Sequence, residues 1–421
     1  MRLGNHPGPH GRFRGMEPME IMGALLTPEG RDDPYPLYEA AHAFGTVVDV
    51  SEGFAMASGY EVVNRVLRDP AFGVWDHELR ARTWPSELVE RPSIKSMERS
   101  VLNSNTPEHG RMRALISSVF TPRRVGMLEP AIEAAVETLL DRLADEGAGG
   151  APVDFMDRFG YRLPVAVICD LLGIPESDRE TFRKLATQLA AVLDFIDLAD
   201  ALDLADAAGT ELESYFGALV AERRRRPADD LTSALIAACD ADEARLDEVE
   251  LLANLTLLLI AGFETTANLF GNGVRLLFEY PEVADDLRLG TVRYAGFAEE
   301  VLRYDSPVQM TSRVALTEGL MVGGLPTPEG TEVALLIGAA NRDPRRYEEP
   351  SRFDPRRTDI NPLSFGAGAH FCVGSVLART EAAIGFPRLL ERFPALASAG
   401  EPRRNDRLVL RGYASLPVTV A

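Results

Sequence analysis

The chain has 421 residues and a formal net charge of −20, because 64 Asp and Glu outnumber 44 Lys and Arg. Such an acidic chain repels phosphate backbones and anionic lipid surfaces, so neither nucleic acid nor a membrane is expected as a partner without a local basic patch. A hydrophobic share of 46% is typical of a globular protein with a large core. Three scattered cysteines, Cys169, Cys239 and Cys372, are too few for a disulfide framework and indicate a reducing cytoplasm.

Helical patterns follow a short N-terminal segment. Residues 1–15 lack the apolar run of a signal peptide, which predicts a disordered extension. Beyond it, apolar residues recur at three- and four-residue spacing between Pro, Gly and Asp. The predicted helices cover residues 106–120, 127–146, 177–198, 201–226, 229–240, a long helix from 246, and 291–304. The apolar stretch 251–263 falls short of the roughly 20 residues that span a bilayer, which predicts a buried helix.

Strand patterns are few and short. They cover residues 46–50, 54–57, 312–315, 332–337 and 408–410. The fold class is therefore expected to be mainly α with a small β portion. Because the sequence contains no internal repeat and no Gly/Ser linker, residues 16–421 are expected to form a single domain.

The segment 365–374, FGAGAHFCVG, is the most informative in the chain. Its glycines allow tight turns, and one cysteine in such a loop is a good soft ligand for a metal. A lone thiolate favours a haem as the bound group. Backbone amides that donate hydrogen bonds to the sulfur can tune the reduction potential of the haem iron. Zinc is disfavoured because no second Cys or His stands at finger or ribbon spacing from Cys372. The alternative is a Gly-rich loop with a structural cysteine.

The long helix carries the polar segment 261–266, AGFETT, within its apolar run. Asp247 and Glu250 form a capping-box pattern at its start. Ala261 is small enough for a flat cofactor to approach, and the Thr265 hydroxyl can bond the carbonyl four residues back and open a groove. Glu264 beside it supplies an exchangeable proton. The alternative is ordinary polarity on a helix surface.

The cysteine loop resembles the haem-binding signature of the cytochrome P450 family, Phe-Gly-x-Gly-x-His-x-Cys-x-Gly, and has all its fixed positions. The resemblance implies a single, mostly helical domain with haem b between the long helix and the loop, Cys372 as the iron ligand, and Glu264 and Thr265 as the catalytic pair that delivers protons to oxygen. The other cofactor-binding positions that it implies are Ala261, Phe365, Gly366, His370 and Gly374.

Two further groups match the family by position. Glu300 and Arg303, three residues apart on a helix, would form a structural triad with Arg352. The haem propionates would be held by four basic residues, His109, Arg113, Arg313 and His370. His109 and Arg113 stand at i and i+4, so both side chains can face one side of their helix.

The resemblance implies a monooxygenase that inserts one atom of O2 into a small to mid-sized organic substrate, by hydroxylation or epoxidation, with secondary-metabolite tailoring as the expected setting. The sequence has no flavin-binding or iron–sulfur motif, so electrons from NAD(P)H are expected through a separate ferredoxin and ferredoxin reductase. A cytoplasmic monomer is expected. Alternatives are a haem-thiolate enzyme of oxidative coupling, dehydrogenation or peroxide-driven oxidation and, more remotely, a non-catalytic haem carrier or sensor.

Family topology also implies the surroundings of the substrate and the redox partner. The expected pocket residues, for each of which a plain core role is the alternative, are Trp75, Trp84, Phe195, Leu258, Val308, Met310 and Tyr413. An acidic ferredoxin would prefer a basic face, with surface salt bridges as the alternative. The candidate arginines for that face are Arg111, Arg123, Arg124, Arg345 and Arg346.

Overall fold

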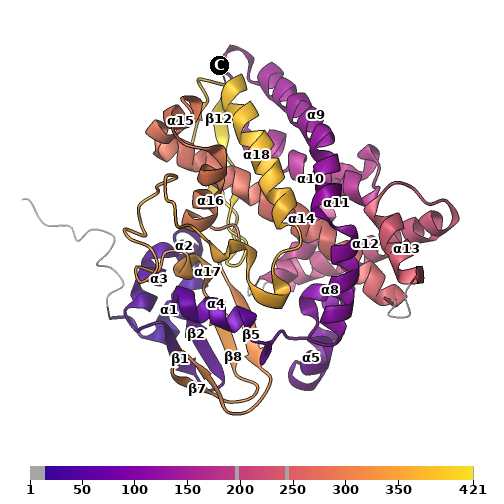
Figure 1. The fold of residues 1–421 in the computed structure, drawn as a ribbon, viewed down its shortest axis with the longest axis vertical. Coiled ribbons are helices and arrows are strands. Elements are labelled where there is room, and N and C mark those ends of the chain that lie inside the picture. The colour runs from indigo at the N-terminus through magenta and orange to yellow at the C-terminus, as the bar shows by residue number, and fades with distance from the viewer. Residues whose placement is uncertain (1–14, 195–198, 242–245, 421) are drawn as a thin grey trace, which may run out of the picture.

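The computed structural model describes residues 15–194, 199–241 and 246–420. Most of the predicted N-terminal extension and the pocket candidate Phe195 therefore lie outside the described residues. Helices make up most of the ribbon, and the larger sheet gathers at one side of it, at the lower left in Figure 1. The predicted fold class, mainly α with a small β portion, is confirmed.

The main sheet joins distant parts of the chain. Its strand order is β1–β2–β8–β5–β3, with β1 (Val47–Ser51), β2 (Phe54–Ala57), β8 (Glu332–Leu335), β5 (Thr311–Ala315) and β3 (Phe72–Gly73). β2 runs parallel to β8, with Phe54 opposite Glu332 and Ala57 opposite Leu335. The helix α4 (Tyr60–Arg68) presents apolar residues at helical spacing, and these pack with Val333 and Leu335 in one core.

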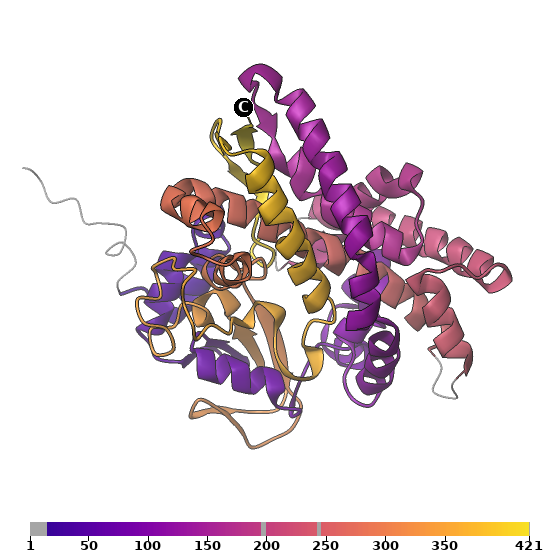
Figure 2. The same ribbon diagram turned by 45° about the horizontal axis from the view of Figure 1, so that its top comes forward.

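The other N-terminal helices lie beside this sheet (Figure 1); they are α1 (Pro18–Leu25), α2 (Pro28–Asp32) and α3 (Tyr35–His42). The larger helical part contains α5 (His77–Thr83), α6 (Ser86–Val89), α7 (Pro92–Glu98), α8 (Glu108–Val119), α9 (Pro122–Glu146), α10 (Arg162–Leu172), α11 (Arg179–Leu189), α12 (Ala199–Arg225), α13 (Leu231–Ala241), α14 (Glu248–Glu279), α15 (Pro281–Arg288), α16 (Tyr294–Tyr304), α17 (Ile337–Ala340) and α18 (Ser375–Arg392). In both views α9 and α18 run side by side (Figure 2).

Two of the predicted helices differ most from the structure. α9 begins at Pro122, five residues before the predicted start, because the Thr121 side chain accepts the Arg124 N–H and caps the helix there. Of the predicted helix 177–198, residues Arg179–Leu189 form α11 and Ala190–Leu193 form a 3₁₀ turn, while 195–198 lie outside the described residues. Further short turns are Val101–Asn103, Ala148–Gly150, Glu176–Asp178, Leu363–Phe365 and Gly368–His370, with a π turn at Met156–Gly160.

The helix α14 runs through the core and carries the candidate segment. Its predicted capping box is formed: the Glu250 N–H donates to Asp247 Oδ1 at 2.8 Å, and the Asp247 N–H donates to Glu250 Oε2 at 3.1 Å. α14 packs against α7, α10, α12, α16 and α18, and the centroid of the Phe270 ring lies 5.0 Å from that of the Phe386 ring of α18. Among the described helices, α14 is long and apolar enough to span a membrane, but 72% of its apolar window is buried inside the protein.

The remaining strands form small sheets. β4 (Val153–Asp154), β12 (Pro417–Thr419) and β9 (Ala397–Ser398) pair in one, β10 (Arg403–Arg404) with β11 (Tyr413–Ser415) in another, and β6 (Leu320–Val322) with β7 (Leu325–Thr327) in a third. The strand predicted at 408–410 is not formed. Leu410 makes only an isolated antiparallel bridge to Val308, and the amides of Leu408 and Val409 donate to the Asp194 carboxylate instead.

Candidate functional site

The cysteine loop is a tight connection that ends at the first turn of α18. The Cys372 N–H donates to the Phe365 carbonyl at 2.9 Å and closes the loop. Gly366 and Gly368 have positive φ angles of 69° and 68°, and a Cβ at Gly368 would lie 2.3 Å from the Leu67 carbonyl of α4. The sharp turn and the close approach both require glycine there.

The environment of the Cys372 thiol has opposing effects on its charge. Burial raises the pKa of the thiol, whereas hydrogen bonds from the Gly374 and Ser375 backbones and the charges of Arg113 and Arg379 act to lower it. The described residues contain no group of three or more His, Cys, Asp or Glu side chains that could hold a metal ion. A multi-ligand zinc site is therefore not built around this cysteine, whereas a single soft ligand with amide donors suits a haem iron.

α14 remains a continuous helix through the predicted segment, but one of its sides is uncovered there. Ala261 is exposed and Thr265 is half-buried, although most of the helix around them is buried. The Thr265 hydroxyl donates to the Ala261 carbonyl at 2.8 Å, the bond that the sequence predicts. Gly262 faces elsewhere, since a Cβ there would lie 2.8 Å from Ile168 of α10. Small, uncovered residues on one side of a core helix leave room for a flat group.

Glu264 lies next to Thr265 in sequence but is buried, with 3% of its surface exposed. Its Oε1 is 3.1 Å from Nη1 of Arg407, which belongs to the loop between β10 and β11. Burial raises the pKa of Glu264, the Arg407 charge lowers it and Asp194 raises it. No motif in the sequence pointed to Arg407, because the contact joins residues that are far apart in the chain.

The four predicted propionate partners converge. The centroids of the His109 and His370 rings lie 4.1 Å apart, and the buried Arg313 donates a hydrogen bond to the Ser312 carbonyl. Burial lowers the pKa of Arg313 to about 10, and burial together with Arg313, His109 and Arg113 lowers the pKa of His370 to about 3. Within the described chain none of the four is paired with a carboxylate, and His109 Nε2 lacks a partner.

The cysteine loop, the uncovered side of α14 and the basic cluster together fit a haem. Two propionates would supply the anions that the basic cluster lacks, and the macrocycle would cover the open stretch of α14. A single thiolate stands on the cysteine loop to hold the iron. The residues present therefore fit haem, with Cys372 as ligand, the four basic side chains as propionate partners, and Ala261 and Thr265 on the opposite side.

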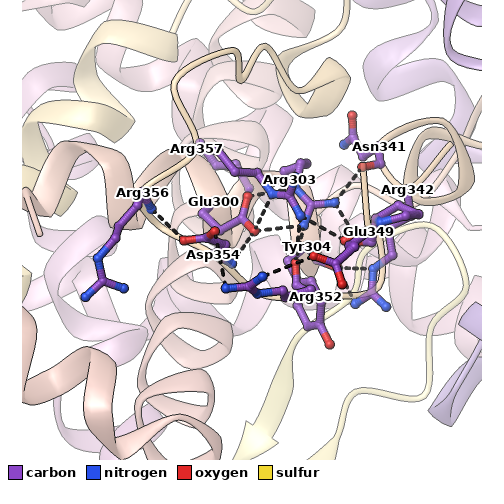
Figure 3. Close-up of polar contacts among 12 residues, drawn as sticks. Glu300, Arg303, Tyr304, Asn341, Arg342, Glu349, Arg352, Asp354, Arg356 and Arg357 are labelled. Atoms are coloured by element: carbon purple, nitrogen blue, oxygen red, sulfur yellow. Dashed lines mark hydrogen bonds and ion pairs between the residues drawn. The ribbon is translucent and has the colours of Figure 1, made fainter. Parts of the chain in front are cut away.

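The Glu-x-x-Arg pair forms a saturated buried cluster (Figure 3). Arg303 uses both Nε and Nη2 on Glu300, at 2.7 and 2.8 Å, and donates further to the carbonyls of Asn341, Pro350 and Arg352. The third side chain at Glu300 is that of Arg357, whose Nε lies 3.4 Å from Oε1. Arg352 takes part through its carbonyl, and its side chain is 61% exposed beside Glu349.

The described pocket candidates are spread over several environments. Trp75 and Trp84 are half-buried, with ring centroids 6.2 Å apart, and Arg80 lies over the Trp84 ring. Leu258 is buried on α14, and Met310 is buried near the half-buried Val308. Tyr413 packs under Arg404 and against the position of Gly271, two turns beyond Glu264 on α14. These contacts fit core roles as well as pocket roles.

Comparison with known proteins agrees with this geometry. A family model described as Cytochrome P450 matches residues 14–290 and 295–416. Cytochrome P450 107B1 of Saccharopolyspora erythraea is 40% identical over 367 residues, 85% of this chain and 87% of that protein. The 6-deoxyerythronolide B hydroxylase of that organism is 37% identical over 348 residues, covering 80% and 84% of the two chains. The solved structure of P450BioI with an acyl carrier protein ligated to hexadec-9Z-enoic acid matches with a TM-score of 0.86 at 34% identity, over 93% of this chain and 100% of that chain.

Proposed function

The chain belongs to the cytochrome P450 family, and we propose that it hydroxylates or epoxidises a mid-sized secondary metabolite, with Cys372 as the thiolate ligand of haem b. It is an oxidoreductase of the haem-thiolate monooxygenase type. The observation that carries the residue assignment is the cluster of His109, Arg113, Arg313 and His370 beside the cysteine loop, because the charges of its two arginines face no carboxylic acid among the described residues and would be balanced by an anionic ligand.

Each residue of the proposed site has a separate task. Bound haem supplies the redox chemistry by which O2 is activated and one of its atoms enters the substrate. Cys372 holds the iron, and its loop amides stabilise the sulfur charge. The Thr265 hydroxyl, which donates to the Ala261 carbonyl, holds a proton on the uncovered side of α14. Glu264 accepts a proton from solvent and passes it toward that hydroxyl.

Members of this family receive electrons from redox partners, and we propose a ferredoxin and its reductase as the source, with NAD(P)H as the donor. Three of the predicted docking arginines are engaged by acids of the chain itself: Arg111 by Glu250, Arg345 by Asp343 and Arg346 by Asp359. Arg123, at the start of α9, is exposed, and so are Phe371 and Val376 beside Cys372. This combination favours the face around Arg123 and Arg124 for an acidic partner.

Replacing Arg123 and Arg124 by Glu is expected to raise the ferredoxin concentration that half-saturates turnover, without changing the haem spectrum. The matched control is Arg345→Glu with Arg346→Glu, at arginines that are engaged by acids of the chain. A larger effect of the control pair would place the docking face there instead. We also propose that residues 16–421 act as one catalytic domain, as a cytoplasmic monomer.

The experiment that tests the function is spectroscopic. The dithionite-reduced protein under carbon monoxide should show the strongly red-shifted Soret band of a thiolate-ligated carbonyl complex, and Cys372→Ser should lose it. A Soret band at the ordinary histidine-haem position in the unsubstituted protein would contradict Cys372 as the ligand. With a substrate in hand, mass spectrometry under ¹⁸O2 should show a gain of one labelled oxygen, whereas loss of two hydrogens or doubling of the mass would establish dehydrogenation or coupling.

A further inference from the structure

The helix α7 is capped by a residue of another helix. Its own N-cap residue, Arg91, makes no side-chain cap hydrogen bond, and Pro92 at its first position has no N–H. The amide of the next residue, Ser93, donates instead to the Asp206 carboxylate of α12 at 3.0 Å, and the Ser93 hydroxyl donates to the same oxygen at 2.5 Å. An acid that stands 113 residues later in the chain therefore acts as the cap of α7.

The contact between α7 and α12 is close on the next turn as well. Gly209 faces α7, since a Cβ there would lie 3.2 Å from the Ser93 Cα. The second Asp206 oxygen lies 2.9 Å from Nη2 of Arg91, which also pairs with Asp203 at 2.5 Å. The two acids differ in burial, because 21% of the Asp206 side chain is exposed and 76% of that of Asp203. α7 is therefore seated on α12 through Asp206 and Gly209, with Asp203 at the edge of the contact.

The segment that follows α7 is fixed on α14. The Val101 N–H donates to Oδ1 of Asn254 at 2.9 Å, and Asn254 is fully buried. Asn254 stands seven residues before Ala261, which is two turns of helix and about 10 Å along its axis, so both side chains lie on the same side of α14. That side is the one left uncovered at Ala261 and Thr265. Residues 101–103 therefore lie two turns from the place where the haem is proposed.

The chain then leads to the residues expected at the haem propionates. His109 stands seven residues after Leu102, and its N–H donates to the Asn105 carbonyl at 2.8 Å at the start of α8. Leu102 is an apolar side chain that remains 38% exposed. The segment 92–103 is thus placed between the uncovered side of α14 and the basic cluster, where a substrate above the haem would meet it.

We propose that Asp206 is a positioning residue for the substrate site: as the cap of α7 it fixes the segment 92–103 beside the uncovered side of α14, and so sets the width of the substrate space without touching the substrate. Without the cap, the segment keeps its bond to Asn254 but loses its hydrogen bonds to α12. A bulky ligand that packs on the segment then loses contacts, whereas a small ligand that needs only the iron does not. The proposal rests on the proposed function, because it takes the haem to be held by Cys372.

The first measurement is hydrogen–deuterium exchange of peptides from the segment 92–103 in the haem-loaded protein. Asp206→Ala removes the cap and should speed exchange there by about 2-fold to 30-fold, the range in which loss of a helix cap shifts an equilibrium. Asp206→Asn should restore slow exchange, because an Asn oxygen also caps a helix. The matched control is Asp203→Ala, which removes the other acid at Arg91 and leaves both bonds from Ser93 to Asp206 in place.

The second measurement separates positioning from a purely structural role. Imidazole and 4-phenylimidazole both bind a haem iron through nitrogen and shift its Soret band, but only the phenyl compound extends far beyond the iron. Asp206→Ala should weaken the binding of 4-phenylimidazole relative to that of imidazole, by at most the factor found for exchange, since the coupling cannot exceed the free energy of the cap. Asp206→Asn should restore the ratio of affinities, and Asp203→Ala should leave it unchanged.

Three results would overturn the proposal. The first is unchanged exchange in Asp206→Ala, or an equal rise in Asp203→Ala. The second is faster exchange with an unchanged ratio of affinities, which would make Asp206 a structural cap alone. The third is failure of Asp206→Asn to restore exchange and ratio, which would place the hold in the ion pair with Arg91.

A variant on the α7 side covers the case in which Asp206→Ala does not fold. Ser93→Ala removes only the hydroxyl bond and should change exchange and ratio in the same directions by a smaller factor; no change in either would overturn the proposal. The exchange measurement needs neither substrate nor redox partner. Its failure is therefore distinct from failure of the proposed function, which the carbon monoxide spectrum and the product mass decide.

Discussion

Replacing Arg303 by Met should destabilise the protein far more than replacing Arg352 by Met. Arg303 is fully buried and all five of its N–H donors are used, on Glu300 and on three backbone carbonyls (Figure 3). Its loss leaves the buried Glu300 with Arg357 and the Asp354 amide as its remaining partners. Removing one partner of a buried ion pair costs about 3 to 5 kcal/mol, a large part of the roughly 5 to 15 kcal/mol by which a typical protein is stable.

Arg352 provides the matched control. Its side chain is 61% exposed and pairs with Glu349, itself 66% exposed, so its loss should cost about 0 to 1 kcal/mol. The Arg352 carbonyl that accepts from Arg303 remains in Arg352→Met. Arg303→Lys tests geometry at constant charge, since three ammonium donors cannot serve the five acceptor contacts of Arg303.

The assay is equilibrium urea unfolding of the haem-loaded proteins, followed by circular dichroism and by loss of the Soret band, after reversibility has been verified. Arg303→Met should lower the free energy of unfolding by at least about 3 kcal/mol. Arg303→Lys should lower it by at least about 1 kcal/mol, because some of the backbone carbonyls that accept from Arg303 would lose their donor. The reasoning is refuted if Arg352→Met costs as much as Arg303→Met, because the exposed arginine would then be the third member of the buried cluster.

Three further outcomes are expected. Thr265→Ala should retain the haem spectrum but divert reducing equivalents to hydrogen peroxide, measured as peroxide per NAD(P)H; unchanged coupling would contradict the role of its hydroxyl. Burial holds the pKa of Glu381 well above its usual value, so its contribution to stability is fully present below about pH 4.5 and is lost as pH rises through the folded-state pKa. Glu381→Gln has no carboxyl to ionise, so its urea unfolding should become progressively less favourable than that of the unsubstituted protein as pH rises, and parallel curves would refute this. Arg313→Gln should weaken haem retention in a transfer assay to apomyoglobin by about tenfold, the loss of one charge-assisted bond, while the exposed Arg123→Gln should not.

Local patterns predicted several elements well because their causes are local. The capping box at Asp247 and Glu250 and the Thr265 bond to the Ala261 carbonyl each depend on residues within four positions of each other. The predicted strand at 408–410 failed for the opposite reason. Its amides are taken by Asp194, more than two hundred residues earlier, and no local pattern reveals such a competitor.

The sequence by itself determined the chemistry of this protein: one thiolate in a glycine-rich loop, a polar segment in an apolar helix, and enough basic residues to hold two carboxylates. The tertiary structure decided which residues meet. It placed Arg357 rather than the Arg352 side chain against Glu300, and Arg407 against Glu264. Residue type and spacing indicate which chemistry one helix or loop can perform. The pairing of buried charges depends instead on how distant segments pack, because the cost of desolvating a charge is offset only when its partner is closely placed.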